Sequence, residues 1–489
     1  MPLRDMPRDQ AWLLPPSLDE LLPLDHPARF VAEFVDALGR EDWRELGVDI
    51  EGDPLGAPAY HPKALLSVWL FGFVTGIRSS RKLEAACRDH IPYLWLTGWQ
   101  HPDHNTLWRF YKDHRQAMRG LLKRTVRTAV AIELVDLAVQ AVDGTKVPAN
   151  ASSCRSYDAK GLAKLLERLD RAIAELENQN EGETDRAPVH LPEELADKRK
   201  LREQVRQAME QLEDRKGPKS INLTDRDARF MKMKQGFCPA YNAQAMVSPV
   251  KTGQETSGML ITAVELVDEP ADYARLTPMM QRAEEMTGVK SPLTLADGGY
   301  HSAAALQECA DRGQQVAMPE SPRGMALDHP YHKDRFTYDA DSDVYRCPQG
   351  QVLSLVRGRF SRKTNKRMYQ APKDTCQACP VAGACLTRGS PRRSLAISPY
   401  DAALRQHRAW MATEEAQSAF KKRKQLVEPV FGIIKEQQGV RRFLLRGVGN
   451  VTAEWTLLAT AFNLRTLWRV WRARKPDYRS LEGKTVPTG

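Results

Sequence analysis

Apolar residues recur at helical intervals through the first part of the chain. The stretch SLDELLPLDHPARFVAEFVDAL spaces them three and four positions apart, and its first residue, Ser17, is a good helix N-cap. HPKALLSVWLFGFVTGIRSSRKLEAACRDH and PDHNTLWRFYKDHRQAMRGLLKRTV continue the pattern, with Gly, Pro and Ser between the apolar runs. The pattern predicts a compact, Trp-rich helical module over residues 1–135.

Strand-like patterns begin after this module. LAVQAVDGTKVPANAS alternates apolar and polar positions, whereas residues 158–216 return to helical spacing with many charges. That return predicts an antiparallel helical hairpin inserted in a sheet. Strand patterns resume in YNAQAMVSP, GMLITAVELVD and SPLTLADGGYHS, with predicted helices among them. This order of elements indicates an α/β domain over residues 136–475.

Two later stretches differ in character. Residues 320–400 read as short strands with turns and contain four of the eight cysteines, which predicts a β-rich, Cys-containing insertion. From 401 to about 473 the pattern is helical and basic, with thirteen Lys or Arg against three Glu between 421 and 475. We expect a flexible tail at 476–489.

The net charge of the chain indicates the kind of partner that it binds. The 489 residues carry a formal net charge of +10, which favours an anionic partner such as nucleic acid. We expect no membrane span, because no apolar run approaches ~18 residues, and no signal peptide, because the start is acidic and Pro-rich. A cytosolic protein without structural disulfides is the expectation.

Two aspartates end strand-like runs. Asp143 follows LAVQAV and precedes Gly144, and Asp297 follows LTLA and precedes two glycines. Either acid alone is explained by turn chemistry, since an Asp side chain can accept from backbone N–H two residues on. The repetition of the pattern predicts that both carboxylates lie at the ends of neighbouring strands.

A third acid stands on the basic C-terminal helix. Glu428 and Lys435 are seven residues apart, about two helical turns, so they are predicted to share a face, although Pro429 kinks the helix or begins a new one. Three converging carboxylates supply the hard oxygen ligands that suit two Mg²⁺ or Mn²⁺ ions, about 3.5–4 Å apart, for phosphoryl transfer. Surrounding Lys and Arg would then bind the DNA backbone.

The cysteine group and one helix suggest further contacts. Cys347, Cys376, Cys379 and Cys385 include one C-x-x-C pair and predict a structural Zn²⁺ site, the alternative being reduced, partly buried cysteines. PDHNTLWRFYKDHR predicts a DNA-recognition helix with Arg109, Lys112 and Arg115 at phosphate distance. His101 and His104 are interpreted as helix caps or surface groups. For the helical module at residues 1–135, the alternative to a DNA-binding domain is an ordinary helical bundle.

Several of these segments together resemble one family. DGTKVPANAS, LADGGYHS and VEPVFGIIK with GVRRFLLRG resemble the three signature regions of DDE transposases from bacterial insertion sequences, most closely the eleven-eighty-two group. NLTDRDARFMKMKQGFCPAYNAQAMV resembles the block between the first two acids, and HPKALLSVWLFGF onward resembles the N-terminal domain. The resemblance spans nearly the whole chain, in order.

The resemblance implies a fold, an activity and partners. It implies an RNase H-like catalytic domain with Asp143, Asp297 and Glu428 as catalytic metal ligands and Lys435 binding backbone near the scissile phosphate. It implies binding of terminal inverted repeats, cleavage at the element ends and joining of 3′-hydroxyls to target DNA, with a homodimer acting. Lys421 and Lys424 replace the family's Tyr and Arg, and Lys lacks the bidentate geometry of Arg. The predicted DNA-binding cations near Glu428 are Lys421, Arg423, Lys424, Arg441 and Arg442.

Two other classes of protein remain open from the sequence. A metal-dependent nuclease without strand transfer would share the three acids. A DNA-binding repressor would share the charge and the helical module, but it has no need of three acids in these positions.

Overall fold

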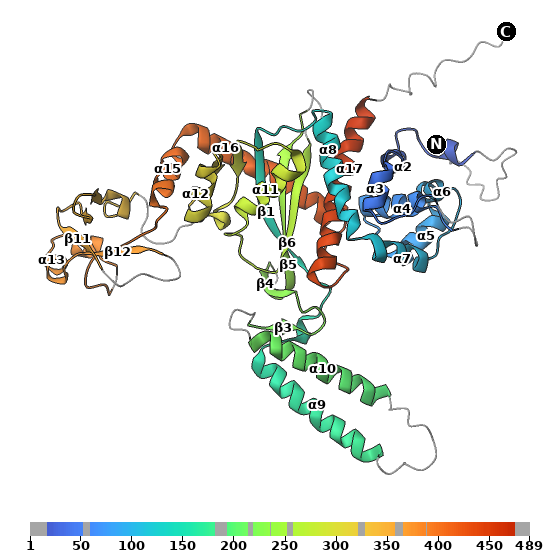
Figure 1. Cartoon of the computed structure of the whole chain (residues 1–489), viewed down its shortest axis with the longest axis horizontal. Coiled ribbons are helices and arrows are strands. Elements are labelled where there is room, and N and C mark those ends of the chain that lie inside the picture. The colour runs from blue at the N-terminus through green and yellow to red at the C-terminus, as the bar shows by residue number, and fades with distance from the viewer. Residues whose placement is uncertain are drawn as a thin grey trace, which may run out of the picture. The chain divides into compact units, whose positions relative to one another are not determined.

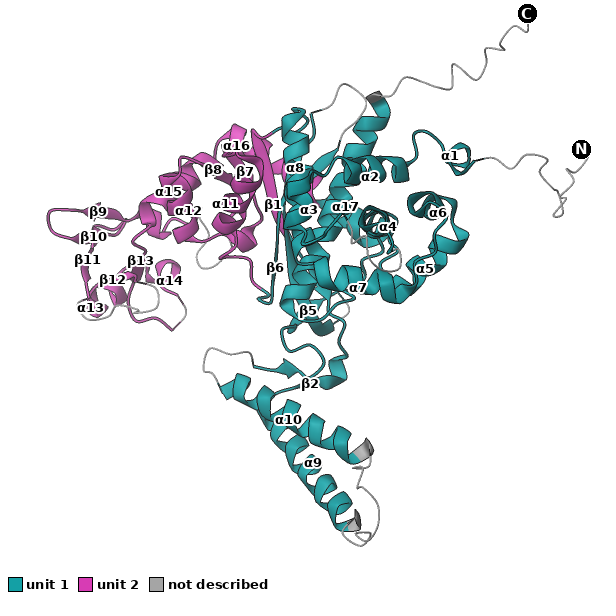
Figure 2. Cartoon of the chain, turned by 45° about the vertical axis from the view of Figure 1, so that its right-hand side comes forward, with its two compact units in different colours: residues 1–136, 144–270, 428–489 teal, residues 137–143, 271–427 magenta. Residues whose placement is uncertain are grey.

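The structure of the chain is a computed structural model. It describes residues 17–51, 59–180, 193–213, 219–234, 236–251, 258–320, 328–356, 365–387 and 389–474, so the predicted tail at 476–489 and the loop of the helical hairpin lie outside it. The chain divides into two compact units, coloured separately in Figure 2. Unit 1 comprises residues 1–136, 144–270 and 428–489, and unit 2 comprises residues 137–143 and 271–427.

The N-terminal region of unit 1 is helical, as the apolar pattern predicts. Helix α4 (Pro62–Thr75) is buried along most of its length because it is apolar on nearly every side. Ser17 caps the first helix, where its hydroxyl accepts from the Glu20 N–H, as expected. None of the described helices is long and apolar enough to span a bilayer. The other helices of this region are α1 (Leu18–Leu21), α2 (Pro27–Asp36), α3 (Arg40–Glu45), α5 (Ser80–Asp89), α6 (Ile91–Thr97), α7 (His104–His114) and α8 (Gly120–Ala131), with a 3₁₀ turn at Ala117–Arg119.

A long buried strand organises the remainder of unit 1. Strand β5 (Gly236–Pro249) pairs antiparallel with β4 (Arg229–Met233) and with β6 (Met259–Val267). Helix α17 (Val448–Arg474) packs against β6 and also against α8, α4 and α2, and it lies beside α8 in Figure 1. Asn463 of α17 fixes this packing: its Nδ2 donates to the Ile261 carbonyl at 2.9 Å, and its Oδ1 accepts from the Ile261 N–H at 2.9 Å.

The predicted helical hairpin is present and has a core of its own. Helices α9 (Ala159–Asn180) and α10 (Glu193–Glu213) pack against each other, and the short strands β2 (Ser156–Tyr157) and β3 (Ile221–Asn222) pair antiparallel at their base (Figure 1). The buried cluster within the hairpin consists of Leu162, Leu169, Val205, Ala208, Ile221 and Leu223.

Unit 2 contains a parallel arrangement of strands. Residues 139–141 of β1 (Val139–Pro148) pair parallel with β7 (Leu293–Leu295), which pairs parallel with β8 (Gln315–Ala317). Parallel neighbours need crossover connections, and helices supply them here. The alternation of strand and helix therefore matches the expected α/β order. The helices of this part are α11 (Leu276–Thr287), α12 (Ala303–Asp311) and α15 (Asp401–Met411).

The cysteine-containing region of unit 2 is a small antiparallel sheet. Its strand order is β13-β12-β11-β10-β9, and a separate buried cluster that includes Phe336, Tyr345 and Tyr369 lies on it. The sequence pattern predicted short strands here, and the structure has them. The elements are β9 (Thr337–Asp339), β10 (Val344–Arg346), β11 (Val352–Leu355), β12 (Arg367–Gln370), β13 (Ser394–Ile397), α13 (Lys373–Gln377) and α14 (Ala382–Cys385). The chain is thus a mixed helix-and-sheet protein with a helical N-terminal region.

Candidate active site

Asp143 lies within a strand and not at the end of one. Strand β1 continues past Asp143 to Pro148, so the expectation that the strand ends on this acid is wrong. Ala141 and Val142 before it are fully buried, whereas the Asp143 side chain is 21% exposed. Arg423, on helix α16 (Glu414–Gly432), places Nη1 3.0 Å from Asp143 Oδ2, and its own side chain is 11% exposed. A guanidinium therefore neutralises this carboxylate in unit 2.

Gly144, the residue after Asp143, lies too close to two buried side chains for a Cβ to fit. In unit 1, a Cβ at Gly144 would lie 2.2 Å from Gln244 Nε2 and 2.9 Å from Asn242 Oδ1. Both side chains are buried on β5, and Gln244 Nε2 donates to Asn242 Oδ1 at 3.0 Å. The Asp-Gly pair is explained by this crowding beside an extended strand, because only a residue without Cβ fits there.

Asp297 occupies the position that the sequence pattern predicts. It follows β7 and caps a 3₁₀ turn at Gly298–Tyr300, where Asp297 Oδ1 accepts from the Gly299 N–H at 2.8 Å. Ser302 then caps α12 by accepting from the Ala305 N–H. Because β7 pairs with β1, the two aspartates belong to neighbouring parallel strands of unit 2.

A further acid, Asp272, lies beside Asp297. A methyl group at Gly299 would stand 2.9 Å from Asp297 Oδ1 and 3.5 Å from Asp272 Oδ2, so both carboxylates flank one backbone position. Burial, reinforced by the charges of Asp272, Asp143 and Asp297, holds the pKa of Tyr300 well above its usual range, and Arg423 opposes that shift. Three carboxylates therefore act on one buried phenol. No sequence pattern marks Asp272, because it stands in an irregular loop before α11, without an adjoining strand or glycine pattern.

Glu428 and Lys435 belong to unit 1. Glu428 is exposed on α16, which runs on through Pro429 to Gly432, so the proline neither ends the helix nor begins a new one. Lys435 lies in the π-helical segment η5 (Ile433–Gln437), where its Nζ donates to Thr145 Oγ1. A π turn holds more residues than an α turn, so the two-turn spacing used to place both residues on one face does not apply to it. The convergence of Glu428 with the two aspartates stays a prediction.

Most of the predicted DNA-contacting cations are exposed. Arg115 is different, because its Nη2 donates to Asn450 Oδ1 at 2.8 Å and its Nη1 to the Lys112 carbonyl, which ties α7 to the start of α17. His104 likewise has a structural partner, Glu84, whose Oε2 lies 2.7 Å from its Nδ1. The exposed cations are Arg109, Lys112, Lys421, Lys424, Arg441 and Arg442. Exposure leaves these six accessible to a phosphate backbone, whereas Arg115 and Arg423 are engaged within the protein.

Across the residues that the structure describes, no group of three or more His, Cys, Asp or Glu side chains stands at coordinating distance of one point. The magnesium and zinc sites therefore stay predictions, in which binding of the metal would bring the ligands together.

Comparison with protein families identifies two matching regions. A family described as "Transposase domain (DUF772)" matches residues 16–113, the helical N-terminal region. A family described as "Transposase DDE domain" matches residues 346–468, a range that contains Glu428, Lys435 and the four clustered cysteines. Asp143 and Asp297 lie outside both ranges. Comparison with curated proteins gives no match.

Both matches are to transposase domains, and they occur in the order expected along the chain. Together they indicate an insertion-sequence DDE transposase, as the sequence resemblance implied. The DDE domain supports an enzyme that cleaves and transfers DNA.

Proposed function

We propose that this chain binds the terminal inverted repeats of an insertion sequence, cleaves DNA at the element ends and joins the 3′-hydroxyl ends to target DNA. The observation that carries the proposal is the placement of Asp143 and Asp297 on neighbouring parallel strands, with both charges acting on buried Tyr300. The DDE-domain match covers the residue that we propose as the third acid, Glu428. An RNase H-like catalytic fold is part of this proposal.

The carboxylates suit a divalent metal. Asp143 and Asp297 offer hard oxygen donors on neighbouring parallel strands of unit 2. Together with Glu428 they would hold two Mg²⁺ or Mn²⁺ ions. When bound, such ions lower the pKa of a nucleophilic water or hydroxyl and stabilise the leaving oxygen.

The reaction proceeds by two in-line displacements at phosphorus. In the first, water forms a bond to phosphorus at the element end, the bond from phosphorus to the 3′ oxygen breaks, and that oxygen leaves as a 3′-hydroxyl after taking a proton. In the second, this hydroxyl gives up its proton and bonds to a phosphorus of the target, which releases a target 3′-hydroxyl. Lys435, held by Thr145, would bind a non-bridging phosphate oxygen near the scissile bond.

The basic residues would hold the DNA. Arg109 and Lys112 on α7 belong to the N-terminal helical region, and Lys421 and Lys424 belong to the helix that carries Glu428. Contacts from such cations to phosphates position DNA without reading its sequence and weaken steeply as salt increases. A homodimer would hold the two ends of the element together.

The test is a cleavage and joining assay on labelled duplexes taken from the DNA that flanks the coding sequence. Wild type, Asp143→Ala, Asp297→Ala and Glu428→Ala are compared with Mg²⁺, Mn²⁺, Ca²⁺ or a chelator. Glu415→Ala is the matched control for Glu428→Ala, because Glu415 is an exposed glutamate on the same helix. We expect metal-dependent nicking and joining that is lost in the three variants, kept in the control, and accompanied by unchanged DNA binding.

The two other classes give different results. Nicking without joining would identify a nuclease and refute the transfer step. DNA binding without metal-dependent chemistry on either flank would identify a repressor and overturn the catalytic proposal.

A further inference from the structure

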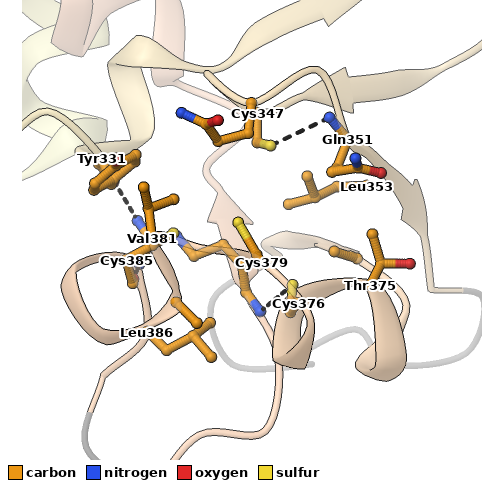
Figure 3. A pocket seen from close by; sticks show the side chains of 14 residues that line it. Tyr331, Cys347, Gln351, Leu353, Thr375, Cys376, Cys379, Val381, Cys385 and Leu386 are labelled. Atoms are coloured by element: carbon orange, nitrogen blue, oxygen red, sulfur yellow. Dashed lines mark hydrogen bonds between the residues drawn. The ribbon is translucent and has the colours of Figure 1, made fainter.

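Cys347 and three cysteines from a later stretch of the chain line one cavity in the small sheet region of unit 2. Cys347 follows β10, Cys376 lies in α13, Cys379 follows α13, and Cys385 ends α14. Figure 3 shows their side chains around the same hollow, with Leu353, Val381 and Leu386 among the other lining residues. All four are free cysteines, so no disulfide accounts for their approach.

Two of the sulfurs already accept backbone hydrogen bonds. The turn after β10 brings the Gln351 N–H to 3.3 Å from Cys347 Sγ (Figure 3). In the same turn the Gly350 N–H donates to the Cys347 carbonyl at 2.8 Å. Gly350 has a φ of 76°, a conformation that its lack of Cβ permits. The Arg393 N–H lies 3.4 Å from Cys376 Sγ. Such donors stabilise a thiolate, which is the form of cysteine that binds metal.

The helices that carry Cys376 and Cys385 are short and have no buried face. Neither α13 nor α14 has a buried residue, and they span five and four residues. Short helices without an apolar face are not stable by themselves. Cys347 and Cys376 pack against the edge of the buried cluster on the sheet, so a link through the sulfurs would fasten both helices to it.

The charge around the cavity suits an anionic metal complex. Arg393 lines the cavity together with the four cysteines, and its Nη1 donates to the Cys385 carbonyl at 3.3 Å. A guanidinium in this position would offset part of the negative charge of four thiolates that hold a divalent ion.

We propose that Cys347, Cys376, Cys379 and Cys385 bind one structural Zn²⁺ ion as four thiolates. Binding releases four protons to solvent and leaves a complex of net charge −2, beside which the Arg393 guanidinium stands. Rotation of the cysteine side chains about the cavity brings the sulfurs to the metal. With four protein ligands the site has no open position, so the ion holds structure and takes no part in the DNA chemistry. This inference does not depend on the proposed function.

The first experiment measures metal in the full-length protein purified without chelator. We expect one zinc per chain, and loss of zinc in each of four single Cys→Ser variants at the proposed ligands. Cys154→Ser and Cys238→Ser are the matched controls, because these cysteines lie outside the region, and they should keep the metal. Asp143→Asn should also keep zinc, which separates this site from the proposed catalytic one.

A second measurement covers the case in which the variants fail to fold. Wild-type protein stripped of metal is titrated with Co²⁺ alone, and hydrogen exchange is followed at residues 373–386. Intense tetrahedral thiolate bands that saturate at one Co²⁺ per chain, with slower exchange in that segment, support the site. Purified protein without zinc, no cobalt spectrum, or iron with sulfide in place of zinc would overturn the proposal.

Discussion

Arg423 Nη1 stands 3.0 Å from Asp143 Oδ2, so a cation from α16 neutralises one proposed metal ligand. Both side chains are mostly buried, with exposed fractions of 11% and 21%. A metal ion bound at Asp143 would have to share this carboxylate with Arg423 or replace it. Arg423 therefore orients this carboxylate.

The first prediction is a strong energetic coupling within this pair. A double-mutant cycle of Arg423→Ala and Asp143→Ala should give a coupling of about 1–2 kcal/mol in the free energy of unfolding, measured by urea denaturation, because desolvated ion pairs interact strongly. The exposed pair Arg441–Glu436, at 3.7 Å and with both side chains more than 70% exposed, is the control. Its coupling should stay below ~0.5 kcal/mol. Equal couplings in the two cycles would contradict the prediction.

The second prediction concerns Gly144. Gly144→Ala should lower the free energy of unfolding by about 1–3 kcal/mol, because its Cβ would overlap buried Gln244, and cleavage should fall because the adjacent Asp143 moves with β1. Adding Gln244→Ala should recover part of the stability. Gly120→Ala is the matched control, since a Cβ there meets no atom within 4 Å. If Gly144→Ala cleaved DNA as wild type does, the close packing beside Asp143 would have no bearing on catalysis.

The third prediction follows from a buried ion pair in unit 1. Arg78 Nη1 lies 2.6 Å from Glu454 Oε1, the two side chains are 7% and 2% exposed, and Glu454 also accepts from the N–H groups of Leu444 and Leu445. Arg78→Met should lower the free energy of unfolding by about 3–5 kcal/mol at neutral pH, because it leaves a buried carboxylate without its charged partner. The change in unfolding free energy would be measured by urea denaturation.

The cost of Arg78→Met should depend on pH. Burial raises the pKa of Glu454 above 4.5, and Arg78 and the backbone donors oppose that shift, so removing Arg78 raises the pKa further. A carboxyl with a raised folded-state pKa contributes its full stability below 4.5 and loses it as pH rises through the folded-state value. The deficit of Arg78→Met should thus grow from pH 5 to pH 8. Adding Glu454→Gln should flatten that profile; a persistent slope would assign it to another group.

The fourth prediction is a loss of stability in mild acid that His407 causes. Burial, followed by the neighbouring His301, lowers the pKa of His407 to about 4, and Glu320 and Arg408 also face it. His407 Nε2 lies 3.1 Å from the Val316 carbonyl and donates to it as a neutral ring. A histidine with a depressed pKa stabilises the fold above 6.5 and loses that contribution as pH falls toward 4.

The matching experiment compares His407→Gln with wild type between pH 7 and pH 4. Between pH 7 and pH 4, the free energy of unfolding should fall by roughly 3 kcal/mol less in the variant than in wild type. His90→Gln, at an exposed position, should keep the wild-type slope. Identical slopes in all three proteins would show that His407 does not carry the acid sensitivity.

Local patterns were sufficient to predict most of the elements. The Ser17 cap, the helical hairpin and the strand before Asp297 follow from neighbouring residues, so the sequence predicts them directly. The continuation of β1 past Asp143 does not, because an Asp-Gly pair ordinarily signals a turn and the distant side chains of β5 decide otherwise.

Contacts between segments that are distant in sequence could not be predicted from local sequence patterns for the same reason. Arg115 reads as a phosphate-binding residue on an exposed helix, yet Asn450, far along the chain, takes its guanidinium. Asp272 has no motif around it, and its place beside Asp297 comes from a contact between two loops that are separated in sequence. The π-helical turn at Lys435 likewise departs from the α-helical spacing that the apolar pattern implies.

Helix α17 has a consequence for how the protein is made. It fills the space against α2, α4, α8 and β6, and Trp468 Nε1 donates to the carbonyl of Asp25 near the other end of the chain. The ribosome synthesises α17 after every one of these partners, so the N-terminal helices emerge with their apolar contact surface bare. A message broken before α17 yields a chain that exposes this surface to chaperones and proteases. The N-terminal helices are therefore covered only once the chain has been synthesised through α17.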